Sequence, residues 1–181
     1  MGWSRGYGRG DRAGVSLQVR LAPLAHAALF PAIERSAGEA FRAIPDLAWI
    51  ADHVVSPAED YLPMIAAGTV WEAVEGETPV GVLLGEITGD TLHVWELSVL
   101  LSHQKQGLGR RLMAAAADHA RVKGLAAVTL TTFRSVPWNG PFYAGLGYKE
   151  LTPPLPEDLQ RLVDAETARG MTDRCAMRLA L

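Results

Sequence analysis

Apolar and polar residues alternate along three neighbouring segments in the middle of the chain, which predicts β-strands at Thr69–Glu75, Val80–Thr88 and Thr91–Val99. Glycine beside acidic residues separates each of these segments from the next. Such connections are typical of hairpins, so we expect the three strands to be antiparallel. A further run of apolar residues and threonines, Leu125–Phe133, is typical of a strand in the centre of a covered sheet.

Apolar positions three and four residues apart predict helices that cover this sheet. The longest runs from Gly107 to Lys123, and Gly124 can cap its end. The other predicted elements are strands at Leu17–Leu21, Gly147–Leu151 and Arg174–Leu181 and helices at Pro23–Ser36, Asp46–Val54, Glu59–Ala67 and Glu157–Arg169. The pattern therefore predicts an α/β protein of the α+β type, with one domain over residues 17–181 after a flexible tail over residues 1–16 that is rich in glycine and arginine.

A glycine-rich connection leads from the third central strand into the longest helix. Gly107 and Gly109 flank Leu108, Gln104 lies three residues before the first glycine, and Arg110 follows the second. Backbone amides at a helix start lack acceptors within the helix, and the helix dipole favours negative charge there. The connection therefore predicts a phosphate site.

The spacing of the glycines narrows the kind of phosphate site. A dinucleotide fingerprint needs a third glycine where Leu112 stands, and the Gly-Lys-Ser/Thr triplet of a nucleotide-triphosphate loop does not occur in the chain. The remaining pattern, Gln-x-x-Gly-x-Gly from Gln104 to Gly109, resembles the pyrophosphate motif of the GNAT superfamily of acyl-CoA-dependent N-acyltransferases. An ordinary strand-to-helix turn with two glycines is the alternative interpretation.

A second stretch strengthens the resemblance. Phe142, Tyr143, Gly147 and Tyr148 are similar to the Phe-Tyr-x-x-x-Gly-Phe/Tyr run of the same superfamily, in which a short helix carries the tyrosine and the glycine ends it. The segment from Thr132 to Asn139 is similar to the same segment in a mostly uncharacterised bacterial branch of the superfamily. This likeness indicates relatives of the chain but not its substrate.

The resemblance implies a GNAT fold: a mixed, mostly antiparallel sheet of about six or seven strands, splayed where coenzyme A binds, with helices on both faces. It also implies acetyl-CoA as co-substrate and no metal. The residues expected to bind this co-substrate are Leu97, Ser98, Val99, Gln104, Lys105, Gln106, Gly107, Leu108, Gly109, Arg110 and Asn139. Asn139 lies closer to Tyr143 than the corresponding asparagine of many relatives does, so helix capping is its alternative role.

The resemblance further implies direct attack of an amine on the thioester of acetyl-CoA. Alkylamines have pKa values of about 10, so the attacking amine must lose a proton. Glu96, on the strand that leads to the phosphate site and offset by one from Trp95 and Leu97, is the first candidate for the base, and Glu34 is the second. Tyr143, neutral at pH 7, is the candidate proton donor to the leaving sulfur.

The acceptor is left open by the sequence. The first hypothesis is a primary amine of a small molecule, and the second is the N-terminus or a lysine of a protein. A third hypothesis is a catalytically silent module that binds coenzyme A or a partner. Glu34 and Trp49 are the candidate acceptor-binding residues, and a homodimer is a further alternative.

Composition and charge argue against several classes of partner and site. The net charge of −3, from 17 basic and 20 acidic residues, argues against a nucleic-acid partner. No apolar run reaches the roughly 18 residues that span a bilayer, no secretory signal is visible, and Cys175 is the only cysteine, so we expect a cytoplasmic protein without a membrane partner. The five histidines show no metal-ligand spacing.

Overall fold

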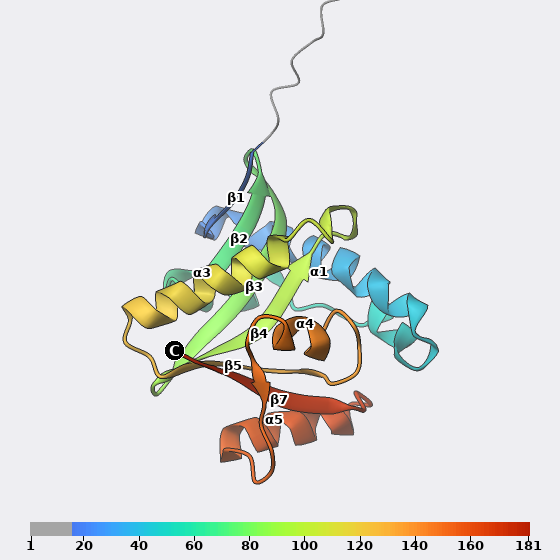
Figure 1. The fold of residues 1–181 in the computed structure, drawn as a ribbon. Coiled ribbons are helices and arrows are strands. Elements are labelled where there is room, and N and C mark those ends of the chain that lie inside the picture. Colours follow the sequence, from blue (N-terminus) through green and yellow to red (C-terminus); the bar gives the residue numbers. More distant parts are fainter. Residues whose placement is uncertain (1–15) are drawn as a thin grey trace, which may run out of the picture.

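The computed structural model describes residues 16–181, in which seven strands form one sheet in the order β1-β2-β3-β4-β5-β7-β6 (Figure 1). The β4–β5 pair is parallel, and every other neighbouring pair is antiparallel. The strands are β1 (Leu17–Leu21), β2 (Val70–Glu75), β3 (Thr78–Thr88), β4 (Thr91–Val99), β5 (Ala127–Phe133), β6 (Lys149–Glu150) and β7 (Arg174–Ala180). The predicted mixed, mostly antiparallel sheet is thereby confirmed. The tail expected over residues 1–16 lies, except for Ser16, outside the described residues.

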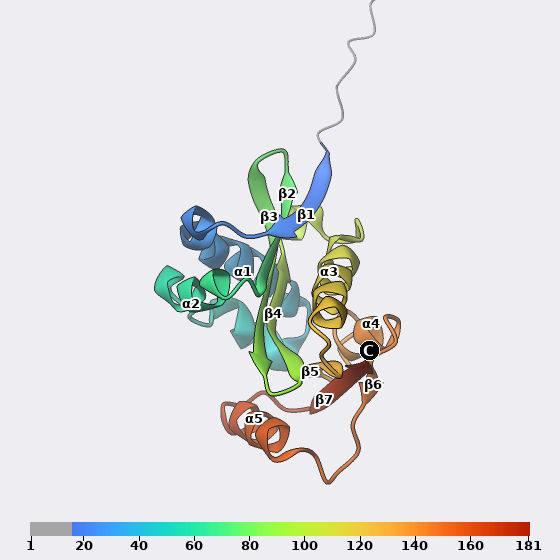
Figure 2. The ribbon, with the colours of Figure 1, turned by 90° about the vertical axis from the view of Figure 1, so that its left-hand side faces the viewer.

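Helices cover both faces of the sheet: α1, α2 and α5 lie on one side, and α3 and α4 lie on the other (Figure 2). The α-helices are α1 (Phe30–Gly38), α2 (Leu62–Ala66), α3 (Leu108–Val122), α4 (Gly140–Ala144) and α5 (Glu157–Ala168). The described residues also contain five short 3₁₀ helices in the connections between these elements: η1 (Leu24–Leu29), η2 (Glu39–Ala43), η3 (Pro45–Asp52), η4 (Ala58–Tyr61) and η5 (Leu101–His103).

The prediction of α-helix between β1 and β2 was wrong over part of that segment. The region expected as one helix over Pro23–Ser36 is η1 followed by α1, and the second expected helix is the 3₁₀ helix η3. Pro31 and Pro63 lie in the first turns of α1 and α2. Because proline has no amide hydrogen to donate to residue i−4, the α-helical ladder cannot extend back through it, and the preceding turns close with shorter-range bonds.

The alternating strands bury one set of side chains on each face of the sheet. On the α3 side, Leu83 and Leu130 pack in a cluster that includes Leu112. On the opposite side, Val82 packs in a second cluster with Phe30. These two layers hold the helices against the sheet, and the ends of the helices and strands form the site.

The sheet opens between β4 and β5. Their pairing stops at Val94↔Leu130, while β5 continues to Phe133 with β7 as its partner. In Figure 1 the two strands diverge, and α4 lies beside the opening. The predicted splay of the sheet is therefore present, and it leaves one edge of β4 without a neighbouring strand from Trp95 to Val99.

Candidate active site

A β-bulge interrupts β4 at the level of the opening. Leu84 faces Glu96 and Gly85 faces Val94, so Trp95 has no partner on β3. A bulge places two successive side chains on the same face, and Trp95 and Glu96 line one cavity. The offset of one residue between Trp95 and Glu96 predicts opposite faces in a regular strand, and this prediction was wrong because of the bulge.

The sequence contains a signal for this bulge. On the α3 side the apolar residues of β4 are Leu92, Val94, Leu97 and Val99. The step of three residues between Val94 and Leu97 breaks the step of two that a regular strand requires.

The open edge of β4 presents backbone groups to the gap. The amide of Leu100 donates to the carbonyl of Val80 at 2.8 Å, which fixes the phase of hydrogen bonding with β3. Because bonded and non-bonded pairs alternate in an antiparallel ladder, the peptide groups of Leu97 and Val99 point away from β3 into the gap. The peptide of Ser98 points toward β3, and the Ser98 hydroxyl donates instead to the carboxylate of Glu96 at 2.6 Å.

The glycine-rich connection forms an open cradle at the start of α3. Gly107 has φ +79° and Lys105 has φ +61°, so the backbone turns sharply before the helix. Within residues 16–181, none of the amides of residues 104–110 donates to a protein acceptor. The structure thus brings together the predicted cradle residues Gln104, Lys105, Gln106, Gly107, Leu108, Gly109 and Arg110.

The cradle is held against the end of β4 and against α4. The side-chain amide of Gln104 donates to the carbonyl of Val99 at 3.2 Å. A Cβ atom on Gly109 would lie 3.4 Å from the ring of Phe142 and 3.7 Å from Leu97, which is ordinary van der Waals contact, so the start of α3 lies close to both residues. The gap and the cradle are therefore parts of one surface.

The short helix α4 carries Tyr143 to the same place. The Asn139 carbonyl accepts the amide of Tyr143 at 3.0 Å, whereas the Asn139 side chain donates to the Thr132 hydroxyl at 3.0 Å and does not cap the helix. The Asn139 Oδ1 atom is buried without a hydrogen-bond partner. Asn139 therefore fixes α4 to β5 and keeps one acceptor free.

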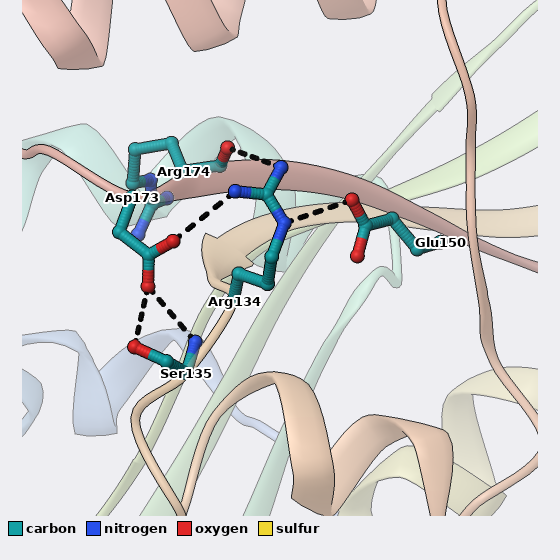
Figure 3. A network of polar contacts seen from close by, with 5 residues as sticks. All are labelled: Arg134, Ser135, Glu150, Asp173 and Arg174. Atoms are coloured by element: carbon teal, nitrogen blue, oxygen red, sulfur yellow. Dashed lines mark hydrogen bonds and ion pairs between the residues drawn. The ribbon is translucent and has the colours of Figure 1, made fainter.

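An ion-pair network secures the connection between β5 and α4 (Figure 3). Arg134 donates to Glu150 at 2.9 Å and to Asp173 at 3.1 Å, and both the amide and the hydroxyl of Ser135 donate to Asp173. Since Glu150 lies on β6 and Asp173 precedes β7, this network anchors the start of the connection to two other strands. The position of Tyr143 then depends on a fixed segment and not on a free loop.

Charge and burial act together on Glu96 and Tyr143. Burial raises the pKa of Glu96, although hydrogen bonds from Ser98 and the Leu97 amide and the charge of Arg174 oppose the rise. Burial, followed by the nearby charge of Glu96, holds the pKa of Tyr143 well above its usual range. The Tyr143 side chain is only 8% exposed, and its hydroxyl remains protonated at neutral pH.

Glu34 joins Glu96 from α1. The Tyr61 hydroxyl donates to Glu34 Oε1 at 2.7 Å. Burial and the neighbouring charge of Glu96 raise the pKa of Glu34 to about 7, which the hydrogen bond from Tyr61 opposes. Two carboxyl groups with raised pKa values in one cleft are typical of sites that move protons.

A cavity of about 440 Å³ extends from these two carboxyl groups. The residues that line it are Glu34, Ser56, Asp60, Tyr61, Met64, Leu84, Glu86, Trp95 and Glu96. Trp49, predicted to bind the acceptor, is not among them and packs instead against His53 with ring centroids 5.9 Å apart. Sequence reasoning missed Trp95, Glu86 and Asp60, because only tertiary contacts bring η4 and β3 to this place.

Replacing Glu34 with glutamine is expected to stabilise the protein at pH 8 and not at pH 5. A folded-state pKa of about 7, above the ordinary 4.5, means that the folded protein loses stability as pH rises through this interval. Glutamine removes this penalty and can still accept from Tyr61, so we expect a gain of about 1–2 kcal/mol at pH 8, less than the full shift because Glu34 is partly exposed. Urea unfolding at both pH values measures it. Glu59→Gln, at an exposed position, is the control, and an equal effect of Glu34→Gln at both pH values would contradict the explanation.

Residues 16–181 also bear on two other kinds of site. No group of three or more His, Cys, Asp or Glu side chains in this part of the chain could hold a metal ion. Likewise, none of the helices described here is long and apolar enough to cross a membrane.

A mixed sheet that opens beside a helix beginning in free amides defines an acyl-transferase type of site. A model of the acetyltransferase (GNAT) family matches residues 38–148, which is more than half of the chain. The chain belongs to the acetyltransferase (GNAT) family, and it is an acetyl-CoA-dependent N-acetyltransferase.

Solved structures of acetyltransferases share this fold. The PaiA N-acetyltransferase of Thermoplasma acidophilum, in complex with coenzyme A, has a TM-score of 0.68 at 16% identity and covers 92% of this chain and 99% of its own. The ribosomal-protein-S18-alanine N-acetyltransferase of Escherichia coli has a TM-score of 0.64 at 17% identity, covering 91% and 94%. N-acetylglutamate synthase of Neisseria gonorrhoeae, complexed with coenzyme A and N-acetyl-glutamate, has a TM-score of 0.68 at 18% identity, covering 92% of this chain and 35% of that longer one.

Proposed function

We propose that this acetyltransferase transfers the acetyl group of acetyl-CoA to a primary amine of a small molecule. Residues 17–181 act as one catalytic domain in this proposal. The observation that carries it is the gap between β4 and β5, where the Glu96 carboxyl group lies close enough to raise the pKa of the Tyr143 hydroxyl. A base and an acid then flank one point, and the open edge of β4 lies beside them.

The residues of the cradle fit the diphosphate of coenzyme A. Amides of residues 104–110 have no protein acceptor within the described part of the chain and lie at the positive end of the α3 dipole. The exposed side chains of Lys105 and Arg110 add positive charge. The carbonyl of Leu97 and the amide of Val99 face the gap, where they can hydrogen-bond the pantetheine arm and the acyl oxygen.

In the proposed step the amine nitrogen attacks the thioester carbon, the C–N bond forms and the C–S bond breaks. Glu96 accepts the proton that the amine loses, directly or through water. Tyr143 donates its hydroxyl proton to the departing sulfur and later regains a proton from solvent. The raised pKa of Glu96 makes this carboxylate a stronger base near neutral pH than an exposed glutamate is.

The dimensions and charge of the cavity support a small acceptor. A volume of about 440 Å³ is in the range of small-molecule sites, and several carboxyl groups line it. The Escherichia coli neighbour is named for a ribosomal protein, so peptides are included as a second class of acceptor in the experiment below.

The proposal is tested by release of free thiol from acetyl-CoA in the presence of amines. A thiol reagent reports coenzyme A with little background, because Cys175 is the only cysteine, is buried, and has a pKa raised to about 11 by burial. Acceptor-dependent release with small amines, and not with peptides, is the expected result. Binding of coenzyme A without release for any acceptor between pH 7 and 9 would instead indicate a silent binding module.

The rate of acetyl transfer is expected to fall on the acid side at a pH nearer to neutrality than the ordinary glutamate pKa of 4.5. Glu96 is a base only when ionised, and its raised pKa shifts the loss of activity upward. The measurement is kcat/KM from pH 5 to 9 for the wild-type protein and for Glu96→Gln, which lacks the titrating group. We expect the variant to be slower and to lose this acid limb, and an unchanged profile would contradict the role of Glu96.

A further inference from the structure

Building on the proposed function, we propose that the acceptor is an α,ω-diamine. Its reacting amine lies at Glu96, and its second, protonated amine lies over Trp95 beside Glu86. The alkyl chain between them occupies the cavity, and the inference rests on where the β4 bulge places the indole ring.

The two ends of the cavity are separated along the sheet. Glu96 is opposite Leu84 on β3, whereas Glu86 is opposite His93 and lies two residues further along that strand. Two residues of an extended strand span roughly 7 Å. The inner end, with Glu34 and Glu96, adjoins the gap beside Tyr143, and the outer end at Glu86 is exposed to solvent.

Trp95 forms a rigid wall between these ends. Its side chain is 46% exposed although it lines the cavity, and its indole Nε1 donates to Glu86 Oε2 at 2.9 Å. Its ring also meets the His93 ring with centroids 4.6 Å apart and planes at 72°. These two contacts fix the plane of an aromatic surface on which an ammonium group and methylene groups both bind favourably.

The charges of the cavity select among amines. Four of its nine lining residues are acidic and none is Lys, Arg or His. Arg174, whose charge acts on Glu96, is itself paired with Glu166 at 2.7 Å. A second cation on the acceptor gains attraction at the outer end, whereas an acceptor with a carboxylate in that position is repelled.

The test compares three acceptors of equal length: 1,4-diaminobutane, butylamine and 4-aminobutanoate. They differ only in the group at the far end, which is cationic, apolar or anionic. With the full chain and acetyl-CoA, we expect kcat/KM for the diamine to exceed that for butylamine on the order of ten-fold or more, mainly through KM, because a desolvated cation–aromatic contact and a charged hydrogen bond favour it. The anionic acceptor is expected to be the slowest of the three.

Two variants locate the selectivity. Glu86→Gln and Trp95→Leu are each expected to reduce the ratio of kcat/KM between diamine and butylamine toward one. The matched control Glu157→Gln makes the same chemical change at an exposed position at the start of α5 and is expected to keep the wild-type ratio. Circular dichroism of each variant verifies that it is folded.

The outcomes separate this inference from the proposed function. Equal rates with diamine and butylamine, a ratio that Glu86→Gln leaves unchanged, or preference for a peptide would overturn the diamine inference while acetyl transfer stands. Absence of thiol release with every amine would overturn the proposed function itself, and the inference with it.

Discussion

Replacing Tyr143 with phenylalanine is expected to lower kcat by about 10²-fold, because the leaving thiolate then has no proton donor. The ring of Tyr143 belongs to the apolar cluster on the α3 side, and phenylalanine preserves that packing. The phosphate cradle lies on another element and does not depend on the hydroxyl. The dissociation constant of coenzyme A is therefore expected to stay within about two-fold of the wild-type value. Thiol release gives kcat, and calorimetry gives the affinity.

Tyr148 provides the matched control for this substitution. It belongs to the same cluster, with its ring centroid 5.9 Å from that of Tyr143, and its hydroxyl is buried without a hydrogen-bond partner. Tyr148→Phe removes an unsatisfied polar group, so its stability should equal or exceed that of the wild type, and its turnover should be retained. Equal turnover in Tyr143→Phe and Tyr148→Phe would eliminate the proton-donor role of Tyr143.

Replacing Gly140 with alanine is expected to damage both stability and turnover. A Cβ atom at this position would lie 2.3 Å from the carbonyl oxygen of Arg134 and 3.1 Å from that of Phe133. Both are backbone atoms, and the ion pairs of Arg134 hold this segment to β6 and β7 (Figure 3), so the helix α4 has to move. We expect a loss of about 1–3 kcal/mol in the free energy of unfolding. Because Tyr143 moves with α4, we also expect kcat to fall on the order of 10²-fold.

Gly38→Ala serves as the control for this prediction. The nearest atoms to a Cβ on Gly38, at the end of α1, lie 3.8 Å away, which is ordinary contact. Urea unfolding and thiol release measured on both variants compare the two sites. Wild-type stability and turnover in Gly140→Ala would show that α4 tolerates displacement, and the placement of Tyr143 by close backbone contact would then be wrong.

Much of the fold followed from local patterns. The hairpin glycines and the alternation of Thr91–Val99 predicted β4 with its observed bounds, and the free amides around Gly107 followed from the chemistry of a helix start. The 3₁₀ helices η1 and η4 were missed because the periodicity of apolar positions does not distinguish them from α-helix where a following proline interrupts the ladder.

The acceptor cavity could not be predicted in the same way. Glu34, Asp60 and Glu86 come from α1, η4 and β3, and nothing in their local sequence connects them. Trp49 was predicted to join them because it is aromatic and lies in the right region of the chain, but the turns of η3 direct it toward His53.

The features that the sequence predicted and the features that only the structure revealed differ in the range of the interactions that determine them. The hairpins of β2, β3 and β4, the glycine cradle and the tyrosine of α4 depend on interactions between residues that lie close together in the chain, which the sequence shows directly. The separation of β4 from β5 and the meeting of Glu34 with Glu96 depend on how distant segments pack. These long-range contacts raise the pKa values and enclose the cavity. Glu34, Glu96 and Tyr143 were therefore recognised in the sequence, whereas their altered pKa values and the rest of the acceptor cavity arose only from folding.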